Sequence, residues 1–141
     1  MDDLAGLAGL LRDVRPKVVI NCIGVVKQAT ASRDPLLTLP VNALFPHQLQ
    51  RLCDLGGIRL VHISTDCVFS GRAGNYRESD IPDAEDLYGR SKLLGEVDVP
   101  NATTLRTSIV GPEPSGAQGF GLLEWFLRQP GPVKGYARAV L

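Results

Sequence analysis

The chain has 141 residues, enough for one domain with a hydrophobic core. Its hydrophobic content of 44% and charged content of 21% are typical of soluble globular proteins. The 15 basic and 15 acidic residues balance, and no basic cluster favours nucleic acid or an acidic membrane. Apolar runs are too short to cross a bilayer, and the acidic start is not a secretory signal. We therefore expect no nucleic-acid partner and no membrane partner.

The cysteines and histidines predict neither disulfides nor a metal site. Cys22, Cys53 and Cys67 stand far apart without a C-x-x-C pair, which favours reduced, buried thiols in a cytoplasmic protein. His47 and His62 have no His or Cys partner at metal-ligand spacing. We expect His47 on a helix surface and His62 within a strand.

The first half of the chain alternates predicted helices with predicted strands. The leucines of 4–11 favour a helix, and the β-branched run in 14–24 favours a buried parallel strand. A short helical turn is expected from Pro35, then a longer helix over 42–55 that ends at a glycine pair. A second buried strand is expected over 58–65.

The second half continues the alternation. Residues 69–86 are rich in Gly and Asp and predict a loop longer than a plain connector. A helix is expected over 87–97, a third strand over 103–110 and an amphipathic helix within 119–131. The segment 133–141 is expected to form a final strand. The pattern predicts an α/β fold with a parallel sheet, whose ligands bind beyond the carboxyl ends of the strands.

The helix over 87–97 carries the most informative pair of residues. Tyr88 and Lys92 are four positions apart and share one face of a helix, ~6 Å apart along its axis. A phenol has an ordinary pKa of about 10, and a nearby ammonium lowers it by stabilising the phenolate. The pair therefore suits proton transfer at a carbonyl or hydroxyl carbon. Alternatively, Tyr88 and Lys92 are merely surface residues of a helix. The pair alone does not decide between these interpretations, and the surrounding motifs favour the first.

Those motifs resemble a known family. HISTDCVFSG (62–71), GNYRESD (74–80), DLYGRSKLLGE (86–96) and LRTSIVG (105–111) resemble, in order and spacing, the extended short-chain dehydrogenase/reductases. The most similar branch is the dTDP-4-dehydrorhamnose reductase (RmlD-like) type, whose members reduce or epimerise nucleotide-linked sugars. VVINCIGVVKQ resembles the strand and turn beside the adenosine side of the cofactor. The resemblance implies a Rossmann-like, doubly wound parallel sheet.

The resemblance also implies roles for the catalytic residues. Tyr88 would be the general acid that protonates the sugar keto oxygen, and Lys92 would hold the nicotinamide ribose and lower the pKa of Tyr88. Thr65 would hydrogen-bond the same oxygen, with Ser64 as a less favoured candidate. Asn42 matches an asparagine that supports the lysine in related enzymes. An asparagine that opens a helix is equally an ordinary N-cap.

The resemblance further implies a cofactor side and a substrate side. An NADP or NAD cofactor, with NADPH favoured, would contact the tyrosine and lysine and residues Asn21, Cys22, Ile23, Thr107 and Ser108. A nucleotide-sugar substrate would contact Ser64, Asp66, Cys67 and Ile109. Sugar 4,6-dehydratases have Asp-Glu after the threonine, so Cys67 disfavours dehydration. Cys67 and Ile109 also replace aromatic residues of rhamnose-type reductases, so another nucleotide-linked 4-keto deoxysugar is expected to fit at least as well.

The sequence departs from the family in one large feature. It contains no G-x-x-G-x-x-G after a strand, the turn whose backbone holds the cofactor pyrophosphate. We therefore expect 1–141 to be a single truncated NAD(P)-binding Rossmann-like domain without the N-terminal Gly-rich βαβ unit, with a substrate region starting near 112–141. An exposed sheet edge would favour self-association or a homo-oligomer.

Two functions follow as hypotheses. The first is an NAD(P)H-dependent reductase or epimerase of a nucleotide-linked 4-keto deoxysugar. The second is a non-catalytic fragment or regulatory subunit that binds a partner or nucleotide sugar without turnover.

Overall fold

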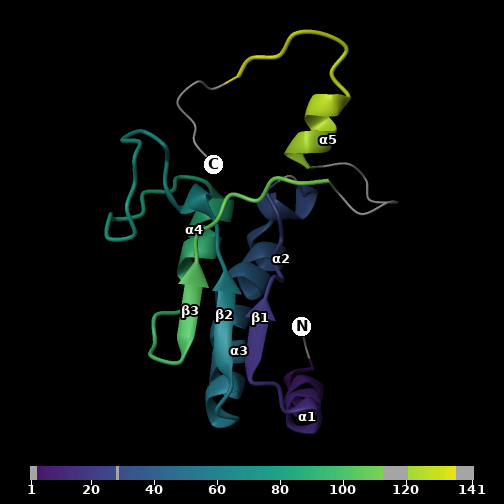
Figure 1. Ribbon diagram of the computed structural model, residues 1–141, viewed down its shortest axis with the longest axis vertical. Helices are drawn as coiled ribbons and strands as arrows, with labels where there is room; N and C mark the ends of the chain where they lie inside the picture. Colours follow the sequence, from purple (N-terminus) through teal and green to yellow (C-terminus); the bar gives the residue numbers. More distant parts are fainter. Residues whose placement is uncertain (1–2, 28, 113–120, 136–141) are drawn as a thin grey trace. The chain divides into compact units, whose positions relative to one another are not determined.

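The computed structural model describes residues 3–27, 29–112 and 121–135 (Figure 1). The chain divides after Thr107 into two units, which are described separately. The α/β class expected from the sequence is confirmed, because helices alternate with the strands of a parallel sheet.

The first unit begins with a helix and a strand. In helix α1 (Leu4–Val14), Asp3 caps the start by accepting a hydrogen bond from the Gly6 N–H at 2.6 Å, and Arg15 ends the helix with a φ of 50°. Strand β1 (Val18–Asn21) follows. The predicted strand over 14–24 is therefore confirmed in its centre.

Four short helical segments occupy the stretch between β1 and the next strand. They are the 3-10 helix η1 (Thr30–Arg33), α2 (Pro35–Leu39), the π-helical segment η2 (Pro40–Leu44) and α3 (Phe45–Leu55). Asp34 caps α2 by accepting from the Leu36 N–H at 2.9 Å. The helical path is continuous through η2, so the predicted helix start at Asn42 is wrong. Asn42 lies inside a helical turn and is no N-cap.

The remaining elements of the first unit carry the candidate site. They are β2 (Arg59–Ile63), the 3-10 helix η3 (Asp66–Val68), α4 (Leu87–Leu94) and β3 (Ala102–Leu105). Residues 69–85 contain no helix or strand, as predicted. Helix α4 stops at Gly95 rather than at 97. A Cβ at Gly95 would collide with the Asn42 carbonyl.

The three strands form a parallel sheet in the order β1–β2–β3. Leu60 and His62 of β2 are fully buried, and the neighbouring Arg59 is exposed. The buried face packs on α3 through Phe45 and Leu49, and Leu7 and Leu11 of α1 join the same core. Helix α3 lies behind the strands in Figure 1, and α1 lies beside the lower end of β1.

The opposite face of the sheet is less covered than the sequence predicted. Val18 is 46% exposed and Ile20 is 63% exposed, although we expected a strand buried on both faces. The register pairs Ile20 with Val61, so both residues lie on this face. Successive side chains along the strands therefore point alternately to the core and to an exposed apolar face.

The second unit contains one described helix, α5 (Leu122–Leu127). This helix confirms the prediction made for 119–131 in its central part. The predicted strand over 133–141 has no regular structure at 133–135, and its remainder lies outside the described residues.

Candidate active site

The carboxyl end of β2 leads into a tight turn that carries Thr65. The Thr65 Oγ1 accepts a hydrogen bond from the Cys67 N–H at 3.1 Å and donates to Asp66 Oδ1 at 3.2 Å. The Asp66 N–H donates to the Thr107 carbonyl at 3.3 Å, which ties the turn to the chain after β3. The turn therefore holds the Thr65 hydroxyl in a defined place.

Tyr88 and Lys92 lie on α4, one helical turn apart. Asp86 caps this helix by accepting from the Gly89 N–H at 2.7 Å. A Cβ at Gly89 would collide with the Cys67 carbonyl and the Ala84 side chain. The missing side chain at Gly89 therefore lets the turn that carries Thr65 pack directly on α4.

The phenol of Tyr88 is partly buried and faces the Thr65 hydroxyl. Burial raises the pKa of Tyr88, and this effect outweighs a hydrogen bond with Thr65 that lowers it. Lys27 also lowers the pKa of Tyr88, whereas Cys67 and Asp66 raise it. We expected Lys92 to lower this pKa, but the cation that does so in the structure is Lys27.

Lys92 is 5% exposed, although it carries an ammonium group. Its Nζ donates to the Ile63 carbonyl at 2.6 Å, at the carboxyl end of β2. Burial lowers the pKa of Lys92, while Glu96 and Cys22 raise it. The buried ammonium is thus held between α4 and the carboxyl end of β2.

Asn42 is fully buried and joins three parts of the chain. Its Oδ1 accepts from the Val25 N–H at 2.8 Å, and its Nδ2 donates to the Val25 carbonyl at 3.0 Å and to Ser91 Oγ at 3.1 Å. A π-helical turn such as the one that carries Asn42 is frequent at functional sites. Asn42 therefore fixes the segment after β1 against Ser91 of α4, the residue before Lys92.

The residues predicted for the cofactor side follow β1. Asn21 is buried; its Oδ1 accepts from the Ile23 N–H at 3.1 Å, and its Nδ2 donates to His62 Nδ1 at 3.1 Å. Cys22 and Ile23 are exposed. The prediction that all three thiols are buried holds for Cys53 only, since Cys67 is half-buried.

The residues predicted for the substrate side divide between the two units. Ser64, Asp66 and Cys67 lie in the turn after β2, within the first unit. Ile109 belongs to the second unit, as does Ser108, which was predicted for the cofactor side, so the structure does not place either residue relative to Tyr88.

Sequence reasoning did not single out Lys27, Glu96 or Arg106. Lys27 Nζ pairs with Asp86 Oδ2 at 2.8 Å, which raises the pKa of Lys27 and brings its charge beside the start of α4. Glu96 and Arg106 form an ion pair at 2.7 Å with side chains only 14% and 24% exposed. The one signal in the sequence was their position inside the quoted motifs, where Glu96 ends DLYGRSKLLGE and Arg106 lies in LRTSIVG.

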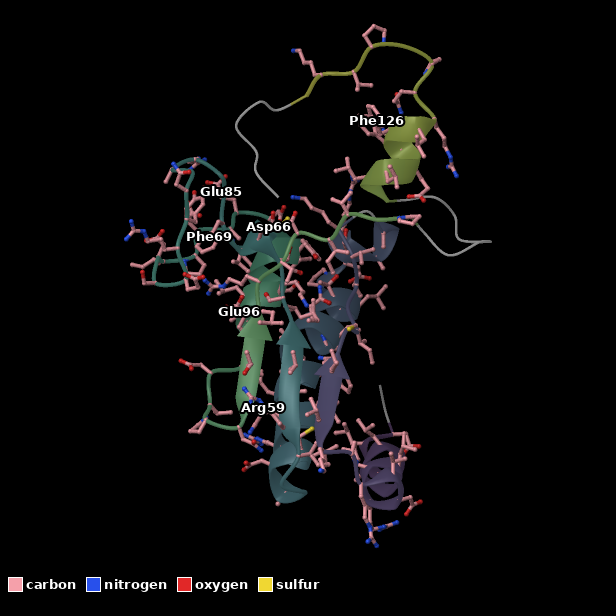
Figure 2. All side chains as sticks on the ribbon, in the orientation of Figure 1. Arg59, Asp66, Phe69, Glu85, Glu96 and Phe126 are labelled. Carbon is pink, nitrogen blue, oxygen red and sulfur yellow. The ribbon has the colours of Figure 1, made fainter. Side chains whose placement is uncertain are left out.

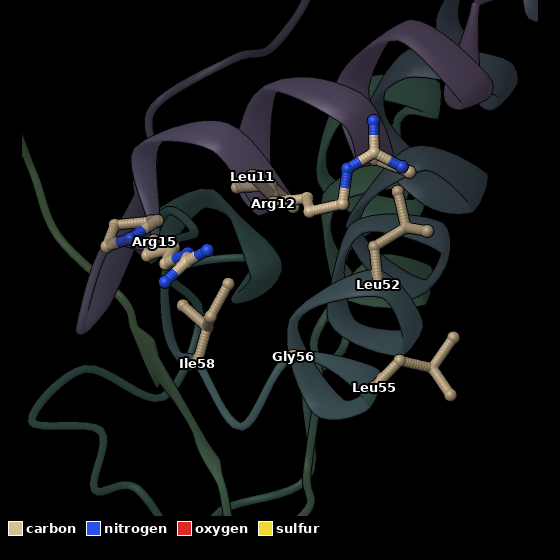
Figure 3. Close-up of a pocket in the computed structure, with 9 residues that line it drawn as sticks. Leu11, Arg12, Arg15, Leu52, Leu55, Gly56 and Ile58 are labelled. Atoms are coloured by element: carbon tan, nitrogen blue, oxygen red, sulfur yellow. The ribbon is translucent and has the colours of Figure 1, made fainter.

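A cavity of about 460 Å³ lies away from these residues, between α1 and α3 (Figure 3). Leu11, Arg12, Leu52 and Ile58 are among the residues that line it. None of the residues discussed for catalysis lines this cavity, so it is not the candidate active site.

Residues 3–27, 29–112 and 121–135 contain no group of three or more His, Cys, Asp or Glu side chains that could hold a metal ion. None of their helices is both long enough and apolar enough to span a bilayer.

Comparison with known proteins identifies the family of the chain. The family model of the RmlD substrate binding domain matches residues 1–124. The dTDP-4-dehydrorhamnose reductase of Mycobacterium tuberculosis is 38% identical over an alignment of 102 residues that covers 66% of this chain and 34% of that protein. Methionine adenosyltransferase 2 subunit beta of Xenopus laevis is 33% identical over 94 residues, which are 67% of this chain and 28% of that protein.

Solved structures give the same relationship. A hypothetical dTDP-4-dehydrorhamnose reductase from Sulfolobus tokodaii superposes with a TM-score of 0.68 at 33% identity, over 74% of this chain and 39% of that one. The dTDP-4-dehydrorhamnose reductase of Bacillus anthracis in complex with NADP gives 0.61 at 31% identity, over 66% of this chain and 34% of that one. The chain thus spans about a third of the length of these relatives. By its match over residues 1–124, the chain belongs to the family of the RmlD substrate binding domain.

Proposed function

We propose that this site reduces, or epimerises and reduces, a nucleotide-linked 4-keto deoxysugar with NAD(P)H. The observation that carries the proposal is that three groups lie at the carboxyl end of β2: the Thr65 hydroxyl, the Tyr88 phenol that it hydrogen-bonds, and the Lys92 ammonium, which donates to the Ile63 carbonyl. Parallel sheets bind their ligands at this end.

The protonation state of Tyr88 is compatible with a role as general acid. A phenol with an ordinary pKa of about 10 already carries its proton at neutral pH, and burial raises the pKa of Tyr88 further, so a proton is available to the keto oxygen. In the proposed step, Tyr88 protonates the keto oxygen of the sugar while the adjacent carbon accepts hydride. In this step the Thr65 hydroxyl, which donates to Asp66 Oδ1 in the structure, would turn to donate to the same oxygen and so orient it toward the phenol.

The residues present fit the nicotinamide half of the cofactor. A Cβ at Gly24 would lie 3.4 Å from Asn42 Oδ1 and 3.8 Å from Lys92 Nζ, so the bare backbone leaves room beside the ammonium. Lys92 would hold the ribose hydroxyls, and the backbone at Asn21, Cys22 and Ile23 would line the cofactor. When bound, the reduced cofactor supplies the hydride. The sequence has no Gly-rich turn to hold the pyrophosphate, and the choice between NADPH and NADH stays a proposal.

The proposed substrate class rests on the turn after Thr65. Cys67 stands where dehydratases carry a carboxylate, so elimination of water has no acid or base at this position. A thiol in place of an aromatic residue also leaves space for a sugar other than dTDP-4-dehydrorhamnose, such as a UDP-N-acetyl sugar. A cytoplasmic location accompanies this proposal, since such nucleotide sugars are expected there.

A second candidate is a non-catalytic subunit that binds a partner or a nucleotide sugar. The observation that favours it is the 33% identity to a protein named as a beta subunit of methionine adenosyltransferase 2. Retention of Thr65, Tyr88 and Lys92 favours the enzyme over this alternative.

Cofactor titration followed by nicotinamide fluorescence tests the proposal. We expect saturable NADPH or NADH binding that Lys92→Met abolishes and Tyr88→Phe preserves. Lys17→Met, which removes an exposed lysine, is the matched control. Turnover of nucleotide-linked 4-keto sugars should be lost in Tyr88→Phe with folding unchanged, because only one hydroxyl is removed. Turnover retained in Tyr88→Phe would refute the role of the tyrosine, and absence of cofactor binding by the folded chain would favour the second candidate.

A further inference from the structure

Glu96 lies just beyond α4 and connects three segments of the first unit. Its Oε1 accepts from Ser64 Oγ at 2.8 Å and from Arg106 Nε at 2.9 Å, and its Oε2 accepts from Arg106 Nη2 at 2.7 Å. This is a two-pronged pair between a guanidinium and a carboxylate, the geometry that gives such pairs their directionality. Glu96 lies at the same end of the sheet as Asp66 and Phe69, opposite to Arg59 (Figure 2).

The two partners of Glu96 flank the candidate site in the sequence. Ser64 directly precedes Thr65, and its N–H donates to the Leu105 carbonyl at 2.7 Å. Arg106 directly precedes Thr107, whose carbonyl accepts from the Asp66 N–H. The carboxylate therefore ties together the chain on both sides of the turn that carries Thr65.

Arg106 extends the same connection into the loop 69–85. Its guanidinium lies over the Phe69 ring, 5.1 Å from the centroid, and its Nη1 donates to the Glu78 carbonyl at 3.5 Å. Phe69 stacks on Tyr76 with centroids 4.4 Å apart. The loop thus rests on the arginine that Glu96 holds.

The loop is also tied back to the turn that carries Thr65. The N–H groups of Asp83 and Ala84 donate to the Val68 carbonyl at 3.1 and 3.0 Å. Asp83 accepts from the Ser70 N–H at 2.7 Å and from Ser70 Oγ at 2.6 Å. Loop and turn therefore form one hydrogen-bonded layer over α4.

We propose that Glu96 and Arg106 are positioning residues, which hold the turn 64–67 and the loop 69–85 in register with Tyr88. This inference rests on the function proposed above, since it concerns the same site. Neither residue touches the proposed reacting atoms; both act through Thr65 and the loop.

Burial and geometry distinguish this pair from the exposed ion pairs of the chain. The Arg72 Nη2 and Glu85 Oε1 atoms are similarly close, 2.8 Å apart, but these side chains are 72% and 62% exposed. Exposed pairs contribute little, because water screens them and their side chains lose entropy. The Glu96–Arg106 pair is shielded and has a second donor in Ser64, so its loss leaves a half-buried charge without its partner.

Hydrogen exchange on the whole 141-residue chain tests the inference without requiring activity. Glu96→Gln keeps an acceptor for Ser64 but removes the charge, and Arg106→Lys keeps a charge but removes the fork. In both variants we expect exchange of the Asp66, Cys67 and Ser70 amides to rise about tenfold or more, with the β1 and β2 amides unchanged. Asp98→Asn and Arg51→Lys, which change exposed residues, are the matched controls. A uniform rise at all amides, or no rise, would overturn the positioning role.

Titration of Tyr88 gives a readout that general destabilisation would not move. The Tyr88 signal, observed by NMR with ring-labelled tyrosine, is assigned by its loss in Tyr88→Phe. If Glu96 holds Thr65 against Tyr88, Glu96→Gln should raise the pKa of Tyr88 in the same direction as Thr65→Val. The double variant should then add nothing beyond Thr65→Val. Cys67, Asp66 and Lys27, the other titratable groups that act on Tyr88, are unchanged in all these variants.

The outcomes separate this inference from the proposed function. An unchanged Tyr88 titration in a folded Glu96→Gln chain would overturn the positioning role even if cofactor binds. Local loosening of the turn with a shifted Tyr88 titration would support it even if no cofactor binds. In a chain that turns over, both variants should lower kcat with little change in cofactor affinity.

Discussion

At the scale of single residues, the first unit buries two groups that normally carry or exchange protons. Lys92 stays close to the Ile63 carbonyl, whereas His62 is held as a neutral ring. His62 Nδ1 accepts from Asn21 Nδ2, so its proton resides on Nε2, which has no hydrogen-bond partner among the described residues. Burial and the charge of Lys92 together lower the pKa of His62 to about 4.

This burial predicts a loss of stability in mild acid. The pKa of His62 is lower in the folded chain than its ordinary value of 6.5, so the unfolded chain binds more protons between these values. The contribution of His62 to the free energy of unfolding is full above about pH 6.5. It falls as the pH approaches 4, by up to about 3 kcal/mol. Urea unfolding at pH 7 and pH 4.5 measures this loss of unfolding free energy.

His62→Gln is the matched variant, because its amide oxygen can still accept from Asn21 but does not titrate. We expect a shallower dependence of the unfolding free energy on pH in His62→Gln than in the parent chain. Asp83 and Asp86, whose pKa values are lowered, titrate equally in both chains and cancel in the comparison. Equal dependence in the two chains would show that His62 is not the group responsible.

At the scale of elements, α4 is positioned by close contacts at its two glycines. Gly89 meets the turn after Thr65, and Gly95 meets the carbonyl of Asn42 in η2. A helix made of larger residues at both places could not approach either segment. The small residues thus decide how near Tyr88 and Lys92 lie to the ends of the strands.

Alanine at two helical glycines should therefore have opposite effects. In Gly9→Ala the new Cβ would lie 3.8 Å from Arg12 Nη2, so we expect a gain of about 0.5–1 kcal/mol from reduced chain entropy. In Gly89→Ala it would collide with the Cys67 carbonyl, so we expect a loss of about 1–3 kcal/mol. Thermal unfolding of both variants measures the difference. Stabilisation in Gly89→Ala would contradict the packing of the turn on α4.

At the scale of the whole molecule, the sheet presents an apolar face and two edges. Val18, Ile20 and Leu105 are 46%, 63% and 42% exposed, and β1 and β3 are the edge strands. Exposed apolar patches and unpaired strand edges both favour contact with another chain.

We therefore expect the 141-residue chain to associate with itself as its concentration rises. Ile20→Lys places a charge on this face at the edge strand β1 and should shift the sedimentation coefficient toward that of the monomer. Leu36→Lys, at an 82% exposed position of α2, is the control and should associate like the parent chain. Identical behaviour of both variants would assign the association to another surface.

The sequence alone predicted the α/β class and the centre of each described strand. It did so because β-branched runs and capped, periodic helices are local signals, as with Asp86 before α4 and Pro35 at the start of α2. The i, i+4 spacing of Tyr88 and Lys92 on α4 is local in the same sense. The roles of these two residues and of Thr65 and Asn42 remain proposals.

Only the tertiary structure decided which distant groups meet. Asn42 contacts Val25 and Ser91 instead of beginning a helix, because the segment after β1 and helix α4 lie on either side of it. Glu96 meets Ser64 and Arg106 because three segments converge beyond the parallel strands. The pKa values of Tyr88 and His62 likewise follow from burial, which depends on the whole fold and not on neighbours in the sequence.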